Sequence, residues 1–213
     1  FADVDAAFGI YGGYIGGRQK YTGNKIDQKG GYVGLSSEFT KDNAFLLSTI
    51  DTGFINNEAE NMYGTDKFDT RWLGVGLKGG YNYALTDTWT LQPNVYAGYT
   101  FVNTEDYTSK SGVKVKTDNL HFFEIDPGFK LSKQIDKGWI GYIQGKYAIV
   151  MDNGGDTKAT NVALPDISHK NYFEYGIGMN KSLTDAWSLN GEINRRDGGR
   201  TGWNGSVEFK YNF

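Results

Sequence analysis

The two histidines of the chain are the first residues to test for acid–base or metal chemistry. His121 stands three residues before Glu124 and five before Asp126, and in a strand that spacing puts the imidazole on one face and both carboxylates on the other. His169 lies in a polar stretch with no second residue at a spacing typical of metal ligands. We therefore expect that the protein is not an enzyme and has no catalytic residue, no metal site and no cofactor.

Charged and amide side chains recur at every second position of several stretches, which is the spacing of one face of a β-strand. If such a face lines an enclosed space, residues of opposite charge should pair, because an unpaired buried charge is costly. We predict that this face lines the lumen of a barrel, either as a salt-bridged interior or as a polar conduit. The predicted lumen-lining residues are Glu38, Lys78, Gln92, Asn94, Glu124, Asp126, Lys130, Lys146, Glu174, Glu192, Arg196, Glu208 and Lys210.

The last stretch of the chain has one polar and one apolar face. Alternation of this kind is typical of a barrel strand with the lumen on one side and lipid on the other. An aromatic residue at the very end also resembles the sorting signal of bacterial outer-membrane barrels, which the barrel-assembly machinery reads. An edge strand of a soluble β-sandwich is the alternative. The predicted assembly signal consists of Trp203, Val207, Phe209, Tyr211 and Phe213.

Similar alternation along the chain predicts an all-β fold of about ten strands. A tilted membrane-spanning strand needs about 9–11 residues, which these stretches provide. In the stretch 139–151 the phase is less clear, and we favour Tyr142, Gln144 and Lys146 on the lumen side. The predicted strands are 8–15, 31–40, 44–54, 72–83, 89–101, 121–132, 139–151, 172–183, 187–196 and 203–213.

The connections between these strands alternate between short and long. Outer-membrane barrels have short periplasmic turns and long external loops, and an even number of strands puts both termini on the periplasmic side. We therefore predict a transmembrane, antiparallel, up-and-down β-barrel. The predicted short turns are 41–43, 86–88, 134–138 and 184–186, and the predicted long polar loops are 21–29, 55–70, 103–119 and 152–170.

Three tryptophans each stand where a strand begins after a short turn. The turn sequences are related, since 86–91 reads TDTWTL and 184–189 reads TDAWSL. Tryptophans at this position favour an aromatic girdle at the periplasmic interface, although each could instead anchor a core. The predicted girdle residues are Trp89, Trp139 and Trp187.

The composition of the chain is compatible with a β-barrel and excludes several other classes. Its 213 residues have a mean hydropathy of -0.53 and contain no apolar run of the ~20 residues that a membrane-spanning helix needs. There is no Cys, so a disulfide framework is excluded, and the net charge of -3 argues against nucleic-acid binding. No signal peptide is visible, so we treat 1–213 as one outer-membrane domain, either a mature form or a C-terminal fragment.

Several short motifs together resemble the C-terminal β-barrel translocator domain of autotransporters, the type V secretion proteins. They are 14–21 (YIGGRQKY), 80–83 (GYNY), 91–93 (LQP), 99–103 (YTFVN), 162–165 (VALP), 173–178 (FEYGIG), 194–200 (NRRDGGR) and 209–213 (FKYNF). The resemblance implies a domain in the bacterial outer membrane that anchors a passenger and assists its translocation to the cell surface. The implied partners are membrane lipid, the barrel-assembly machinery and a passenger that is not part of this chain.

The chain departs from the family pattern in two respects. The family barrel has twelve strands, whereas about ten are predicted here. The missing hairpin would lie either around 55–71 or upstream of Phe1. The family also has a helix through the lumen, for which residues 1–7 are too short. The alternatives to a translocator are a barrel that uses its external loops for binding or adhesion, a small-solute channel, and a hydrolase sited at the rim.

Overall fold

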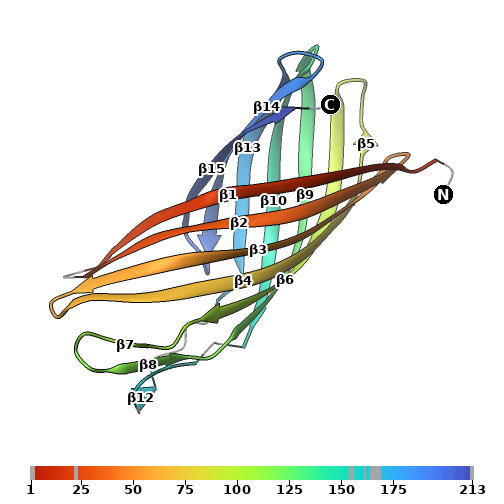
Figure 1. The fold of residues 1–213 in the computed structure, drawn as a ribbon. Coiled ribbons are helices and arrows are strands. Elements are labelled where there is room, and N and C mark those ends of the chain that lie inside the picture. Colours follow the sequence, from red (N-terminus) through yellow and green to blue (C-terminus); the bar gives the residue numbers. More distant parts are fainter. Residues whose placement is uncertain (1–2, 22–23, 154–155, 161, 164–168, 212–213) are drawn as a thin grey trace.

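The computed structural model describes residues 3–21, 24–153, 156–160, 162–163 and 169–211. Most of these residues form one antiparallel sheet in which ten strands follow one another in chain order (Figure 1). The fold is therefore all-β and up-and-down, as predicted. The ten strands are β1 (Asp5–Tyr21), β2 (Asn24–Lys41), β3 (Ala44–Asn61), β4 (Gly64–Tyr81), β6 (Trp89–Thr104), β9 (Leu120–Asp136), β10 (Trp139–Asp152), β13 (Tyr172–Ser182), β14 (Trp187–Gly198) and β15 (Gly202–Tyr211).

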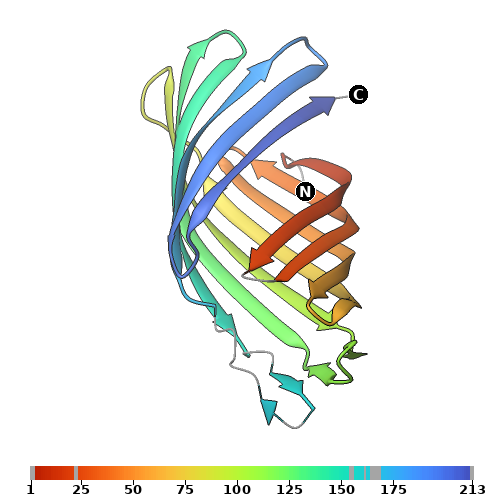
Figure 2. The same cartoon turned by 90° about the vertical axis from the view of Figure 1, so that its left-hand side faces the viewer.

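Five short strands complete the described structure. β5 (Tyr83–Ala84) pairs with β6 beside a short turn. The other four belong to the connections predicted as loops 103–119 and 152–170, and they form a small separate sheet at the end of the molecule opposite the last residues of β15 (Figures 1 and 2). They are β7 (Tyr107–Thr108), β8 (Lys114–Thr117), β11 (Thr157–Ala159) and β12 (Val162–Ala163).

The large sheet is curled, and its two edge strands stay apart (Figure 2). β1 and β15 lie at the ends of the strand order, and no ladder joins them in the part of the chain that the structure describes. The barrel predicted from the sequence would require the last strand to pair with the first, and in the described residues this pairing is absent. Closure requires strand number, tilt and stagger to match, and these ten strands leave the sheet open as a half-barrel.

For two of the predicted long loops, 55–70 and 21–29, the prediction was wrong. β3 and β4 remain paired from Ala44 and Tyr81 to Asn61 and Gly64, so the stretch 55–70 is a regular hairpin around a two-residue turn. The stretch 21–29 is likewise mostly strand, because β2 begins at Asn24. Water can solvate both faces of a hairpin that extends beyond the membrane, so its side chains need not alternate in polarity although its backbone is fully paired.

The short turns lie where the sequence predicted them, and the related turn sequences adopt the same structure. The Thr86 hydroxyl accepts a hydrogen bond from the backbone N–H of Trp89 (3.1 Å), and the Thr184 hydroxyl accepts one from Trp187 (3.0 Å). Gly138 has a positive φ of 70°, which suits glycine in the turn before Trp139. Each of these turns thus brings a tryptophan to the start of the following strand.

The two faces of the sheet differ in polarity. One face, here called the inner face, has hydrogen bonds that pass over an intervening strand, for example from Tyr11 on β1 to Asp51 on β3 (3.4 Å). Such contacts require a concave surface. The opposite, outer face exposes large apolar side chains, including Ile10 (81 % exposed) and Val207 (72 %).

A soluble sandwich would bury this apolar face against a second sheet. In the described residues the only cluster of buried apolar side chains is small, and consists of Ala148, Val150 and Tyr172. The apolar residues are thus displayed outward, as a lipid-facing surface requires. No helix among the described residues has the length and apolarity needed to cross a membrane.

Candidate functional site: the polar inner face

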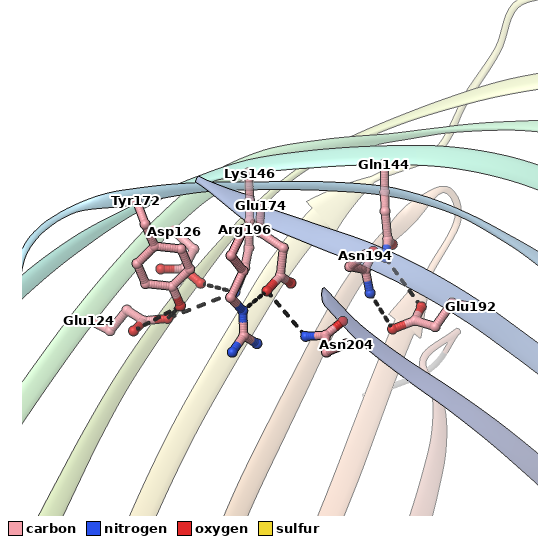
Figure 3. A network of polar contacts seen from close by, with 10 residues as sticks. All are labelled: Glu124, Asp126, Gln144, Lys146, Tyr172, Glu174, Glu192, Asn194, Arg196 and Asn204. Carbon is pink, nitrogen blue, oxygen red and sulfur yellow. Dashed lines mark hydrogen bonds and ion pairs between the residues drawn. The ribbon is translucent and has the colours of Figure 1, made fainter. Parts of the chain in front are cut away.

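A buried carboxylate with a lysine partner lies near the middle of the inner face. Asp126 on β9 is 1 % exposed, and Lys146 on β10 donates to its Oδ2 at 2.5 Å (Figure 3). The same ammonium lies 3.8 Å from Glu124, so one cation serves two carboxylates that share a face of β9. This pairing is what an enclosed polar surface needs, because two unpartnered carboxylates would repel each other.

A tyrosine and an arginine extend this cluster across the next two strands. The Tyr172 hydroxyl on β13 donates to Glu124 at 3.2 Å, passing over β10. Arg196 on β14 forms an ion pair with Glu174 on β13, and Asn204 on β15 lies 3.5 Å from the same carboxylate (Figure 3). The cluster therefore links five consecutive strands, β9 to β15, through side chains alone.

A second cluster surrounds Glu192 on β14. Its carboxylate accepts hydrogen bonds from Tyr142 (3.1 Å), Gln144 (3.2 Å) and Asn194 (3.0 Å). Tyr142 and Gln144 belong to β10, so these bonds pass over β13. The phase that the sequence analysis favoured for the stretch 139–151 therefore agrees with the structure.

Glycines opposite tyrosines make room for these bridges. Tyr142 faces Gly178 across the β10–β13 ladder, and a Cβ at Gly178 would overlap with the tyrosine ring. Tyr11 lies against Gly34 in the same manner. A tyrosine can lie flat over a neighbouring strand only where that strand has no side chain, which explains the glycines at 34 and 178. The sequence shows these glycines but does not show which tyrosine covers them.

The remaining predicted lumen residues are distributed unevenly. Gln92 donates to Asn82 at 2.7 Å, Asn94 donates to the Gln92 carbonyl at 3.1 Å, and the Lys130 ammonium lies 3.9 Å from the centre of the Tyr142 ring. Lys78 lines the same hollow as Asn94. The other three, Glu38, Glu208 and Lys210, are exposed and lie outside the two clusters.

Two hollows of about 330 and 420 Å³ lie over the clusters. Their lining carries both signs of charge together with amides and phenols, so it can solvate many polar groups without favouring one ion. In the part of the chain that the structure describes, no three His, Asp or Glu side chains are grouped as metal ligands. The hollows share the lining residues Lys78, Asn94 and Lys146.

Several residues of the inner face were not predicted from the sequence. Asp51 accepts a hydrogen bond from the Trp72 indole at 2.9 Å, and Asn57 is only 4 % exposed and donates to Thr70. Tyr172 and Asn194 were also not assigned, although both have the inward parity of their strands. Parity identified the face, but burial within it depends on the curvature of the sheet.

Both histidines lie apart from the inner-face carboxylates. His121 contacts the Tyr99 hydroxyl at 2.7 Å and the Phe101 ring on the outer face. His169 lies 2.9 Å from Asp152, a partner that the sequence analysis did not anticipate, and its ring packs edge-on against Phe122. Neither imidazole contacts Glu124 or Asp126 among the described residues.

The three predicted girdle tryptophans share the outer face, close to the short turns. Trp89, Trp139 and Trp187 are 36 %, 37 % and 46 % exposed. The first two have a lysine ammonium, from Lys133 and Lys181, at 5.2 and 5.3 Å from the ring centre. Their role as an interfacial girdle stays a prediction.

The residues of the predicted assembly signal are displayed along the outer face of β15. Trp203, Val207, Phe209 and Tyr211 are all exposed on one side of this strand. Phe213 lies outside the described residues. Recognition of this strand by an assembly factor stays a prediction.

Ion pairs lie near the ends of the β1–β2 and β3–β4 hairpins, beyond the part of the outer face that exposes apolar side chains. Lys25 pairs with Glu60 at 2.6 Å, and Lys67 pairs with Glu58 at 2.7 Å. Arg18 donates to Asp27 at 2.5 Å, and this hydrogen bond lowers the pKa of the Asp27 carboxyl. These exposed pairs fit a part of the sheet that stands in water.

A curled antiparallel sheet with a polar inner face and an apolar outer face defines the class of outer-membrane β-barrels. Within this class, the chain belongs to the autotransporter β-domain family, whose model matches residues 2–194. Members of this family are outer-membrane domains of Gram-negative bacteria.

Individual relatives are distant in sequence and close in fold. The chain is 22% identical over 216 residues to the uncharacterized protein YaiT of Escherichia coli K12. The match covers 95% of this chain but only 22% of YaiT. The transport unit of the Escherichia coli autotransporter AIDA-I superposes with a TM-score of 0.85 at 19% identity, covering 100% of this chain and 77% of that one. The β domain of the Bordetella autotransporter BrkA gives 0.79 at 19% identity, covering 98% and 84%.

Proposed function

We propose that this chain is the outer-membrane part of an autotransporter, where it anchors a passenger and assists its movement to the cell surface. Membership of the family supports the proposal, and the inner face is the structural observation that carries it. Its paired charges, amides and phenols can solvate successive segments of an unfolded polypeptide without binding one of them tightly. A passing chain of varied sequence needs a lining of this kind.

We further propose that the partners are membrane lipid on the outer face, the barrel-assembly machinery at β15 and a passenger. β1 and β15 are the two edge strands of the described sheet, and such edges require partners in lipid, which cannot satisfy free backbone N–H and C=O groups. A further hairpin would close the sheet, and would bring the strand count from ten to the twelve of the family. The region 55–71 cannot supply it, because it is already paired within β3 and β4.

We also propose that the domain has no catalytic activity of its own. The Tyr99–His121 contact lies on the outer face, and Asp152 and His169 pack beside Phe122. The carboxylates of the two inner-face clusters instead pair with Lys146 and Arg196 or accept hydrogen bonds from tyrosines and amides.

Surface display in cells tests the proposed translocation. The gene that encodes this chain would carry an epitope upstream of the codon for Phe1, and antibody binding to intact cells would be measured. We expect the epitope at the surface, and we expect it to be lost when the codons for β9 to β15 are deleted. Equal surface signal without these strands would refute the proposal. So would an epitope that stays inside cells whose outer membrane contains the folded barrel.

A further inference from the structure

A groove of about 640 Å³ crosses the outer face of β1 to β4. Elsewhere the outer face exposes many large apolar side chains. The groove lies toward the long-hairpin end of the sheet, away from the tight turn at Asp42. The residues that line it are Gly13, Gly31, Tyr32, Val33, Thr52, Gly53, Phe54, Asp69 and Arg71.

The floor of the groove is backbone, and its walls are apolar. Gly31 has no side chain to fill the space, although a Cβ there would make only ordinary contacts, 3.4 Å to the Gly13 carbonyl and 3.9 Å to the Phe54 ring. The Thr52 hydroxyl donates to the Trp72 carbonyl at 2.7 Å, which leaves its methyl group to the groove. Val33 and Phe54, 53 % and 50 % exposed, form the walls.

A cation, Arg71, and an anion, Asp69, lie at the end of this apolar groove. On β4 the outer face is uncharged from Tyr81 to Leu73, a length comparable with a tilted membrane crossing, and Arg71 is the next outward residue. Arg71 is exposed, and among the described residues no ion pair or side-chain hydrogen bond engages its guanidinium. The nearby Asp69 instead accepts a hydrogen bond from Asn56 at 2.8 Å.

The composition of the groove matches the two parts of a membrane lipid. A guanidinium at the edge of the hydrocarbon layer reaches toward the headgroups, where phosphate offers the planar, bidentate partner that it prefers. Lys29, one outward position beyond Gly31 on β2, adds a second exposed cation on the headgroup side. A lipid without a charged headgroup would not interact with the charges of Arg71 and Lys29. A free phosphate ion would not cover the apolar walls.

We propose that this groove binds one lipid molecule that has a phosphate-bearing headgroup. An acyl chain lies along Gly31 between Val33 and Phe54, and the phosphate accepts hydrogen bonds from Arg71. This inference rests on the proposed membrane location. It adds a specific ligand and a site on the outer face, independent of the inner face that carries the proposed translocation.

Native mass spectrometry of the purified full chain, released from detergent micelles, tests the site. The probes are phosphatidylglycerol and, as the control without phosphate, diacylglycerol. Arg71→Gln should weaken phosphatidylglycerol binding at least about fivefold, since a cation near the headgroups contributes on the order of 1 kcal/mol. It should leave diacylglycerol binding unchanged. Gly31→Leu should weaken the binding of both probes, because it fills the groove.

Two variants elsewhere on the outer face serve as matched controls. Arg195→Gln removes an outward arginine that already pairs with Asp197 at 2.9 Å. Gly191→Leu fills an outward position where, among the described residues, a Cβ would meet only the Ser206 carbonyl, at 4.0 Å. Both should bind lipid like the parent chain.

The groove assignment is overturned if Arg71→Gln and Gly31→Leu retain parental lipid affinity, or lose no more than the two controls. Circular dichroism of each variant in detergent shows that the compared proteins are folded. The result does not depend on surface display, which tests the proposed translocation separately. A chain that displays its epitope but binds lipid without using Arg71 would refute only the lipid site.

Discussion

At the scale of single residues, the inner face consists of charges that depend on one another. Asp126 is almost completely buried, and its Oδ1 has no hydrogen-bond partner among the described residues, so Lys146 is its principal source of stabilisation. Lys146 also faces Glu124, and its removal would leave two carboxylates close together. A buried pair of this kind contributes little net stability compared with an apolar pair, but breaking it by removing one partner is expensive.

We therefore expect Lys146→Met to destabilise the protein by about 3 kcal/mol, as measured by the urea midpoint of refolding into detergent. Lys210→Met is the matched control, because Lys210 has an inward parity but is exposed on β15, and its loss should change stability by less than about 0.5 kcal/mol. In the double variant Lys146→Met/Asp126→Leu much of the lost stability should return. Equal urea midpoints for the two single variants would show that the Lys146–Asp126 pair does not contribute to stability.

At the scale of elements, each main strand has one face that suits water, on the inner side, and one that suits lipid, on the outer side. β6 shows this separation: Val95 is half exposed on the outer face, and Asn94 lines the inner hollow. The first four strands have 17 or 18 residues, more than the about 9–11 that a tilted crossing needs. Their excess length forms the ion-paired hairpins that stand beyond the apolar band.

The two faces of β6 should respond differently to the same substitution. Val95→Arg places a charge against lipid, and near the midplane this should cost about 2–4 kcal/mol of folding free energy in a bilayer. Asn94→Arg places the same group in a polar hollow and should have a smaller effect. Folding yield into vesicles, followed by heat-dependent gel mobility, measures both variants. If they fold equally poorly, the face assignment of β6 is incorrect.

At the scale of the whole molecule, the half-barrel has two distinct ends. The short turns lie at one end, together with the end of β15 (Figure 1). Three of the strands that follow these turns begin with a tryptophan. The long hairpins and the small sheet lie at the other end. The small sheet also contacts the β3–β4 hairpin: Tyr107 stacks on Phe68 with ring centres 4.7 Å apart, and the Lys110 N–H donates to Asp66 at 2.7 Å.

Limited proteolysis of intact cells should distinguish these ends. If the long-hairpin end is outside, protease added to cells should cut at the turn Met62–Tyr63 and in the stretch 110–112, both of which are exposed connections. The turns 86–88 and 184–186 should be cut only after the outer membrane is permeabilised. Peptide mapping by mass spectrometry gives the cleavage sites. Cleavage of intact cells at the short turns would reverse the orientation.

The sequence alone determined the fold class, the number of main strands and the direction in which most side chains point. These properties are local, because a strand alternates its faces with a period of two and a tight turn depends on a few adjacent residues. For the same reason the related turns at Thr86 and Thr184 could be recognised before their hydrogen bonds were seen. The inward parity of Asp126, Lys146 and Glu192 followed from this local pattern.

The tertiary structure decided which of these residues meet. Lys146 reaches Asp126, and Tyr142 reaches Glu192 over an intervening strand, because of strand register and sheet curvature, which depend on distant segments at once. The paired hairpin at 55–70 was also not predictable, since both of its faces meet water and the alternation that marks a membrane strand disappears while the backbone bonds persist. The separation of β1 from β15 is likewise a property of the whole sheet, because closure depends on the combined number, tilt and stagger of all its strands.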